Sequence, residues 1–154
     1  MQYNLEMHEV FSCSQSAQQV FDYIVDFSHI NEWDHTIVTS NKVGDSAIGL
    51  GSRFDLVFSM GLRKSPISYE ITEFASPSKA ELTGTSKSFT AIDTVQIEQQ
   101  EHGCLVNWHA KIVFTGLSAF IVPFLASKIK AGGAQTIRDL NAILDSQVAL
   151  PNRA

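Results

Sequence analysis

The stretch CLVNWHAKIVF, residues 104–114, decides the fold class because its side chains change character with a period of two. Successive side chains of a strand point to opposite faces of a sheet. Polar Asn107, His109 and Lys111 share one parity, so we predict that they face solvent. The opposite parity is apolar and is expected to face inward; it comprises Cys104, Val106, Trp108, Ala110, Ile112 and Phe114.

The same period recurs upstream, in segments that glycine and proline separate, which predicts an antiparallel meander with one wet face. Further strands are expected from about Ile37 and, more weakly, around Ala80 to Thr85. Two of the predicted inward faces are interrupted by an acid, at Glu9 and at Asp93. The inward faces are Leu5, Met7, Phe11 and Cys13; Phe54, Leu56 and Phe58; Ile67, Tyr69 and Ile71; and Ala91, Val95 and Ile97.

Helical patterns lie on both sides of the meander. Ser16 and Gln19 form a capping-box pattern that opens a helix. Ser28 is expected to cap a second short helix that ends at about Trp33. A long helix is predicted from about residue 118 to 146, with Pro123 starting or kinking its regular part. Its apolar arc is expected to hold Leu125, Ile129, Gly133, Leu140 and Leu144.

The predicted order is therefore a strand, two short helices, about six strands and a long helix, which is an α+β fold. The apolar face of an antiparallel sheet must be covered, and the long helix is the obvious cover. A strongly bent sheet can leave a cavity beneath such a helix. One domain is expected over residues 1–150, with a frayed tail at 151–154.

Composition limits the classes of partner. The net charge is −5, and Arg63-Lys64 is the only adjacent basic pair. Nucleic acids and anionic membrane surfaces attract positive patches, so neither is expected as a partner. The longest apolar stretch, residues 117–126, is broken by Pro123 and is too short for stable membrane insertion. Two cysteines and no recognisable leader predict a cytoplasmic location.

Four motifs in order resemble one known superfamily. They are VFDYIVDFSHINEWDHTI, GLGSRF, ISYEITEFASPSKAEL and VNWHAKIVFTG. From about Glu6 to Leu144 the chain resembles the START-like (SRPBCC) superfamily, and most closely its polyketide cyclase/dehydrase and lipid-transport branch. The resemblance implies a helix-grip fold, in which a curved seven-stranded antiparallel sheet surrounds a long C-terminal helix and a deep apolar cavity. It also implies a small hydrophobic ligand, such as a lipid, a polyketide or an aromatic compound. It implies no cofactor and no particular catalytic residue.

Several polar residues are candidates for the cavity. Trp33 is expected to close one end of the cavity, and His35 to be a rim group. His35 could instead act as a general base, or these residues could simply form a polar junction at the end of the helix. Asp93 could bind a ligand hydroxyl or act as an acid, unless a bulge turns it outward. The hydroxyl of Tyr69 could bind ligand or a backbone group. Gly133 suggests close helix–sheet approach, room for a ligand, or a kink.

The remaining predicted ligand-binding residues are apolar, and residue type alone cannot say whether they line a cavity or fill the core. They are Phe54, Phe58, Trp108, Phe114 and Ile129. The five histidines lack the spacing of a zinc site, so no metal is expected. Binding or transport of a small hydrophobic ligand is the favoured function. The alternative is a cyclase or dehydratase acting on a polyketide-like or aromatic substrate. It would need at least two converging titratable groups, and Asp93, His35 and Tyr69 are the plausible set.

The two cysteines allow a test of strand order. Cys13 ends the first predicted strand and Cys104 begins the last one. If these strands are antiparallel neighbours, both side chains approach each other on the inward face. We expect free thiols there, acting as small buried apolar groups, because a reducing compartment opposes a disulfide.

Overall fold

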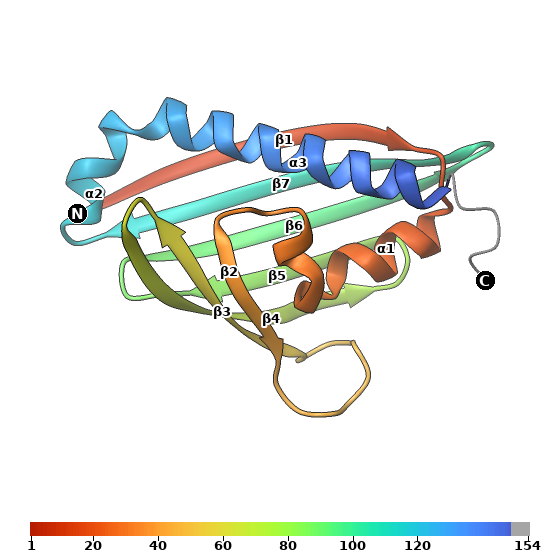
Figure 1. The fold of residues 1–154 in the computed structure, drawn as a ribbon, viewed down its shortest axis with the longest axis horizontal. Coiled ribbons are helices and arrows are strands. Elements are labelled where there is room, and N and C mark those ends of the chain that lie inside the picture. The colour runs from red at the N-terminus through yellow and green to blue at the C-terminus, as the bar shows by residue number, and fades with distance from the viewer. Residues whose placement is uncertain (149–154) are drawn as a thin grey trace.

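A computed structural model describes residues 1–148, which form one seven-stranded antiparallel sheet and a set of helices on its concave side (Figure 1). The strands lie in the order β1-β7-β6-β5-β4-β3-β2. From β2 to β7, each strand pairs with the next one along the chain. β1 pairs with β7 and forms the other edge of the sheet. The strands are β1 Gln2–Cys13, β2 Ile37–Lys42, β3 Arg53–Met60, β4 Arg63–Ala75, β5 Lys79–Thr85, β6 Phe89–Gln100 and β7 Gly103–Thr115.

Helix α3, Ala126–Val148, runs along the side of the sheet formed by β1 and β7 (Figure 1). The helix expected from residue 118 is divided into α2, Ser118–Ile121, a 3₁₀ turn η2, Val122–Phe124, and α3. Pro123 lies in the 3₁₀ turn, and proline cannot continue a regular helix. The prediction that Leu125 belongs to the apolar arc is wrong: it ends η2 and is 40% exposed.

Two short helices connect β1 to β2 along the chain. Helix α1, Ala17–Val25, begins with the predicted capping box, in which Ser16 and Gln19 bond each other's backbone. The second helix is a 3₁₀ helix, η1, Phe27–Glu32. Its cap is Asp26 rather than Ser28, because the Asp26 carboxylate accepts from the Ser28 amide at 3.1 Å. Carboxylates are strong N-caps, and Asp26 directly precedes η1, whereas Ser28 already lies inside it.

The predicted strand faces are confirmed. Trp108 is 6% exposed, whereas the side chain of its neighbour His109 is 43% exposed. The inward faces of β3, β4 and β6 are buried against α1, η1 and the second half of α3. The helix-grip fold is therefore the fold of this chain. None of the helices within residues 1–148 is both long enough and apolar enough to cross a lipid bilayer.

The cysteines confirm the predicted strand neighbours. Cys13 and Cys104 are direct Cα partners at the end of the β1–β7 ladder. Both are buried and unbridged. They therefore pack as two small apolar side chains where β1 and β7 meet.

Candidate functional site

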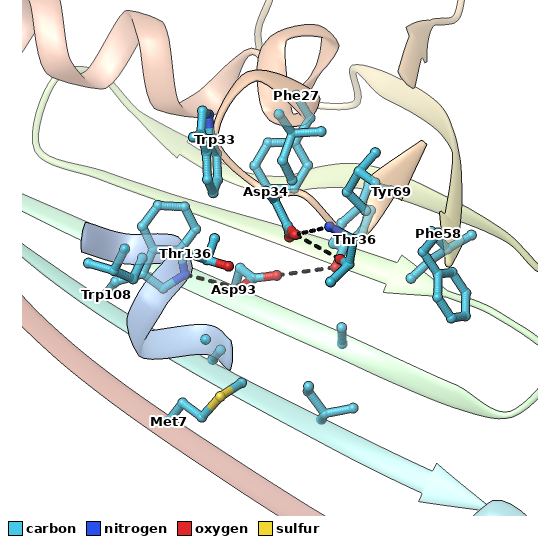
Figure 2. A pocket seen from close by; sticks show the side chains of 18 of the residues that line it. Met7, Phe27, Trp33, Asp34, Thr36, Phe58, Tyr69, Asp93, Trp108 and Thr136 are labelled. Carbon is cyan, nitrogen blue, oxygen red and sulfur yellow. Dashed lines mark hydrogen bonds between the residues drawn. The ribbon is translucent and has the colours of Figure 1, made fainter. Parts of the chain in front are cut away.

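A cavity of about 210 Å³ lies between the curved sheet and the helices. Its walls come from the sheet, from η1 and the loop that follows it, and from the middle of α3 (Figure 2). Most of the wall is aromatic or aliphatic. The lining residues are Met7, Glu9, Phe27, Ile30, Trp33, Asp34, Thr36, Ile37, Phe58, Ile67, Tyr69, Phe89, Ala91, Asp93, Trp108, Ala110, Ile112, Gly133, Thr136 and Ile137.

The central polar group of the cavity is the carboxyl of Asp93 on β6. The indole Nε1 of Trp108 on β7 donates a hydrogen bond to its Oδ1 at 3.0 Å. The hydroxyl of Tyr69 on β4 donates to its Oδ2 at 3.4 Å. Figure 2 shows the carboxyl between these two donors. Three strands thus meet at one acid, and both donors are held by otherwise apolar rings.

Burial sets the ionisation of this group. It raises the pKa of Asp93 from 3.8 to about 6, although the hydrogen bonds from Trp108 and Tyr69 oppose the rise. The negative charge of Asp34 raises the pKa of Asp93 further. Burial also raises the pKa of Tyr69 well above its ordinary value, and the charge of Asp93 adds to that effect. Tyr69 therefore stays a donor near neutral pH, while Asp93 can exchange a proton there.

Gly84 allows Tyr69 to reach Asp93. The two strand positions are direct partners, with Tyr69 on β4 opposite Gly84 on β5. A Cβ at position 84 would lie 2.6 Å from Cζ of the Tyr69 ring. The ring therefore lies flat over the glycine and extends across β5 toward β6. Sequence reasoning missed Gly84, although a lone glycine inside a strand is a known sign of close approach.

The helical side of the cavity is built from Trp33, Asp34 and Thr36. Trp33 is 2% exposed, and its ring meets that of Trp108 edge to face with centroids 5.5 Å apart. Asp34 follows η1, and its Oδ1 accepts from the Thr36 amide at 3.0 Å and from the Thr36 hydroxyl at 2.7 Å. These bonds hold the Asp34 carboxylate at the wall opposite the sheet (Figure 2).

Six of the ten predicted site residues line the cavity: Trp33, Phe58, Tyr69, Asp93, Trp108 and Gly133. Gly133 faces the sheet as predicted, since a Cβ there would lie 2.7 Å from Sδ of Met7. The structure places Asp93 inward, so the alternative of an outward bulge does not apply.

The other four predicted residues lie outside the cavity wall. His35 is a surface residue: its side chain is 76% exposed, and its Nε2 lies 3.5 Å from Oδ2 of Asp139. His35 is not among the residues that line the cavity, so it does not join Asp93 and Tyr69 in a catalytic set. Phe54 is fully buried behind Phe27, with ring centroids 6.1 Å apart. Phe114 and Ile129 belong to a separate apolar cluster around Leu5 and Val122.

Sequence reasoning also missed lining residues that alternation could not identify. Asp34 and Thr36 lie in an irregular loop, where no period exists. Phe27 continues the apolar stripe of the preceding helix, so its burial could be predicted but not its place in the cavity wall. Ile30 comes from a 3₁₀ helix of six residues, which is too short for a helical stripe of its own. Glu9 was visible as an acid on an inward parity, the same signal that identified Asp93. Among residues 1–148, no group of three or more histidine, cysteine or acidic side chains could hold a metal ion.

Solved structures share this fold across nearly the whole chain. A putative uncharacterized protein from Rhizobium leguminosarum has a TM-score of 0.72 at 10% identity, covering 95% of this chain and 97% of that one. Ara h 8.0201 has a TM-score of 0.67 at 10% identity, covering 94% and 99%. At such identities the likeness shows the fold alone.

A third solved structure is the di-domain ARO/CYC StfQ from the steffimycin biosynthetic pathway. Its TM-score is 0.71 at 7% identity, and the match covers 96% of this chain but 52% of that one. No protein with a curated function matches the chain by sequence. The family model described as polyketide cyclase / dehydrase and lipid transport matches residues 7–145. Fold, cavity and sequence match agree, and the chain belongs to the polyketide cyclase/dehydrase and lipid transport family.

Proposed function

We propose that the chain binds and carries a small hydrophobic molecule in the cavity under α3. The observation that supports this most directly is the cavity itself, a largely apolar space of about 210 Å³ in which the hydrogen-bonded carboxyl of Asp93 is one of few polar groups. Ligand sites typically combine an apolar wall with a few polar groups that fix orientation. The family binds small hydrophobic ligands, which agrees with this assignment.

The volume limits the size of the ligand. Sites for drug-sized molecules usually enclose roughly 300–1,000 Å³. A cavity of about 210 Å³ therefore suits a compact molecule, or the head of a longer one. Trp33, Phe58 and Trp108 would contact its apolar part, Gly133 would leave room for it, and Asp93 with Tyr69 would orient a polar group. We assign no contact to Phe54, Phe114 or Ile129, and only a rim position to His35.

Native mass spectrometry of the purified protein tests this function. We expect a co-purified small molecule, or uptake of an added aromatic compound. Ala110 lines the cavity from β7, so Ala110→Leu should fill part of the space and reduce the bound fraction. Lys111→Leu is the matched control, since position 111 is the next residue and has the opposite parity. Equal loading of both variants would contradict binding in this cavity.

A catalytic role is the second candidate, and one observation favours it. Asp93 has a pKa of about 6 beside the hydroxyl of Tyr69, which suits a general acid near neutral pH. In a dehydration, the acid form of Asp93 would protonate the leaving hydroxyl. As water leaves and the double bond forms, the resulting carboxylate would take the proton from the neighbouring carbon. Any compound found by mass spectrometry should then lose the mass of one water on incubation with the protein, and Asp93→Asn should abolish that loss. An unchanged compound supports the carrier.

We also propose that one domain, residues 1–150, carries this function, and that it works in the cytoplasm. The paired thiols of Cys13 and Cys104 are unbridged, in keeping with a reducing compartment. Residues 149–154, which include the expected tail, lie outside the described part of the chain. Reducing and non-reducing mass analysis of freshly purified protein tests the compartment, and a bridged pair would contradict it.

A further inference from the structure

The ionisable groups on the cavity wall all have one sign. Glu9, Asp34 and Asp93 line the cavity, and within residues 1–148 no lysine, arginine or histidine belongs to the lining. A buried carboxylate is costly unless a positive group or several donors accompany it. Two neutral donors reach Asp93, one from Trp108 and one from Tyr69. The wall therefore supplies negative charge and hydrogen-bond acceptors but no cation to balance them.

The carboxylates face the cavity from different elements. Asp93 comes from the middle of the sheet, and Asp34 comes from the loop on the opposite side (Figure 2). They are close enough for the charge of Asp34 to disfavour ionisation of Asp93. Glu9 lies on β1, and its side chain has no hydrogen-bond or ion-pair partner among the described residues. A positive group placed between Asp34 and Asp93 would relieve the repulsion and neutralise both walls.

Aromatic rings surround the same space. Trp33 and Trp108 meet edge to face at 5.5 Å, and Phe27 and Tyr69 meet edge to face at 5.0 Å. All four line the cavity near Asp93. The faces of such rings attract cations, most strongly when the cation is removed from water. Rings and carboxylates together form the kind of surface that recognises an organic cation with an apolar body.

We propose that the ligand of this cavity is an amphipathic amine, whose ammonium group lies between Asp93 and Asp34 and whose apolar part contacts the aromatic rings. This inference rests on the proposed binding function and adds the chemical class of the ligand. The ammonium group donates to the free acceptor positions of the two carboxylates. The rings exclude water and hold the carbon skeleton.

The two tryptophans give a direct readout. Trp33 and Trp108 are the only tryptophans of the chain, and both line the cavity. Fluorescence titrations at neutral pH should compare 2-phenylethylamine with 2-phenylethanol, which has the same skeleton but no charge. We expect the amine to bind about tenfold more tightly, the order expected for hydrogen bonds to a charged group.

Two carboxylate variants test the position of the ammonium group. Asp93→Asn should reduce amine affinity by about tenfold and change alcohol affinity by less than about twofold. Asp55→Asn on β3 is the matched control, because Asp55 is exposed and lies outside the cavity lining, so amine affinity should not change. The comparison of the two probes on the unaltered protein stands even if Asp93→Asn folds poorly.

The outcomes separate this inference from the proposed function. Equal or tighter binding of 2-phenylethanol would overturn the amine assignment while leaving a hydrophobic-ligand carrier in place. Amine binding that survives Asp93→Asn unchanged would also overturn it. If neither probe quenches the tryptophan fluorescence and native mass spectrometry detects no bound small molecule, both the inference and the proposed function are overturned.

Discussion

Asp93 shows how one residue can link the stability of the protein to its chemistry. The carboxyl lies on an inward strand face, between apolar Ala91 and Val95, and two side-chain donors reach it from neighbouring strands. Burial disfavours its charged form more than these donors favour it. The folded state therefore holds a proton on Asp93 at pH values where the unfolded chain has already released it.

This proton predicts a pH dependence of stability. The pKa of Asp93 rises from 3.8 to about 6 on folding. The stabilisation that the bound proton gives the folded state is therefore fully present below about pH 4 and is lost as pH rises toward and through 6. The loss is on the order of 2–3 kcal/mol. Urea unfolding of the protein and of Asp93→Asn should show that the asparagine variant gains relative stability from pH 4 to pH 7. A difference that stays constant over this range would contradict the buried charge.

Gly84 offers a second test at a single position. In Gly84→Ala the new Cβ would clash with the Tyr69 ring, which must tilt and weaken its bond to Asp93. We expect a loss of about 1–3 kcal/mol in the free energy of unfolding, as for other overpacked sites. In a Tyr69→Ala background the same change should cost much less, because the clashing ring is gone. Equal costs in both backgrounds would show that the ring does not depend on the glycine.

The sequence could predict which of these residues face inward, but not which ones meet. Strand parity alone places Asp93, Tyr69 and Trp108 on the inward face. Their contact depends on the register of four strands and on a glycine that lets one ring cross β5. Asp34 lies in a loop without a period, so the sequence could not predict that its carboxylate faces the cavity. Phe114 was placed on the correct face but beyond the end of the cavity.

Among the secondary-structure elements, α3 shows how a helix can cover a sheet without filling the space beneath it. Leu140 and Leu144 in its second half are fully buried, whereas Gly133 in its first half has only a hydrogen atom facing Met7 of β1. The order of elements and the strand faces followed from periodicity. The division of the last helix did not, because the pattern around Pro123 does not specify where a helix restarts.

The glycine pair in α3 gives a matched test of this cover. A side chain at Gly132 would meet open space, while one at Gly133 would meet Sδ of Met7 and enter the cavity. We expect Gly132→Leu to gain roughly 0.5–1 kcal/mol from helix propensity. Gly133→Leu should instead lose about 1–3 kcal/mol through overpacking and should block ligand uptake. Denaturant unfolding gives the stabilities, and similar values for the two variants would contradict the assigned faces.

The junction of β1 and β7 makes a further prediction about its two thiols. Burial raises the pKa of Cys13 and raises that of Cys104 to about 11, so both are thiols rather than reactive thiolates at pH 8. We expect iodoacetamide at pH 8 to leave the folded protein unmodified and to label both cysteines in denaturant. Mass spectrometry reads the result directly. Rapid labelling of the folded protein would contradict the burial of this junction.

At the scale of the whole molecule, core and cavity wall are the same surface. The inward faces of β3, β4 and β6 bury the core at one end and line the cavity at the other. Solved structures with 7–10% identity keep this architecture. Such divergence is possible because the sheet needs apolar inward side chains of suitable volume, not particular ones. Patterning could therefore predict the fold class and the order of elements, whereas the helix-grip fold was implied by the family resemblance, and the choice of the proposed ligand would depend on a few polar positions.

The ladder between β1 and β7 also determines how the molecule responds to mechanical force. All twelve residues of β1 have a partner in β7, from Gln2 opposite Thr115 to Cys13 opposite Cys104. Handles at Gln2 and His102 would pull the two strands past each other and load every hydrogen bond at once. Handles at Gln2 and Thr115 would open the same ladder one pair at a time. Single-molecule pulling should therefore give a much higher rupture force for the first geometry. The protein is expected to resist force along its edge strand and to yield to force applied across it.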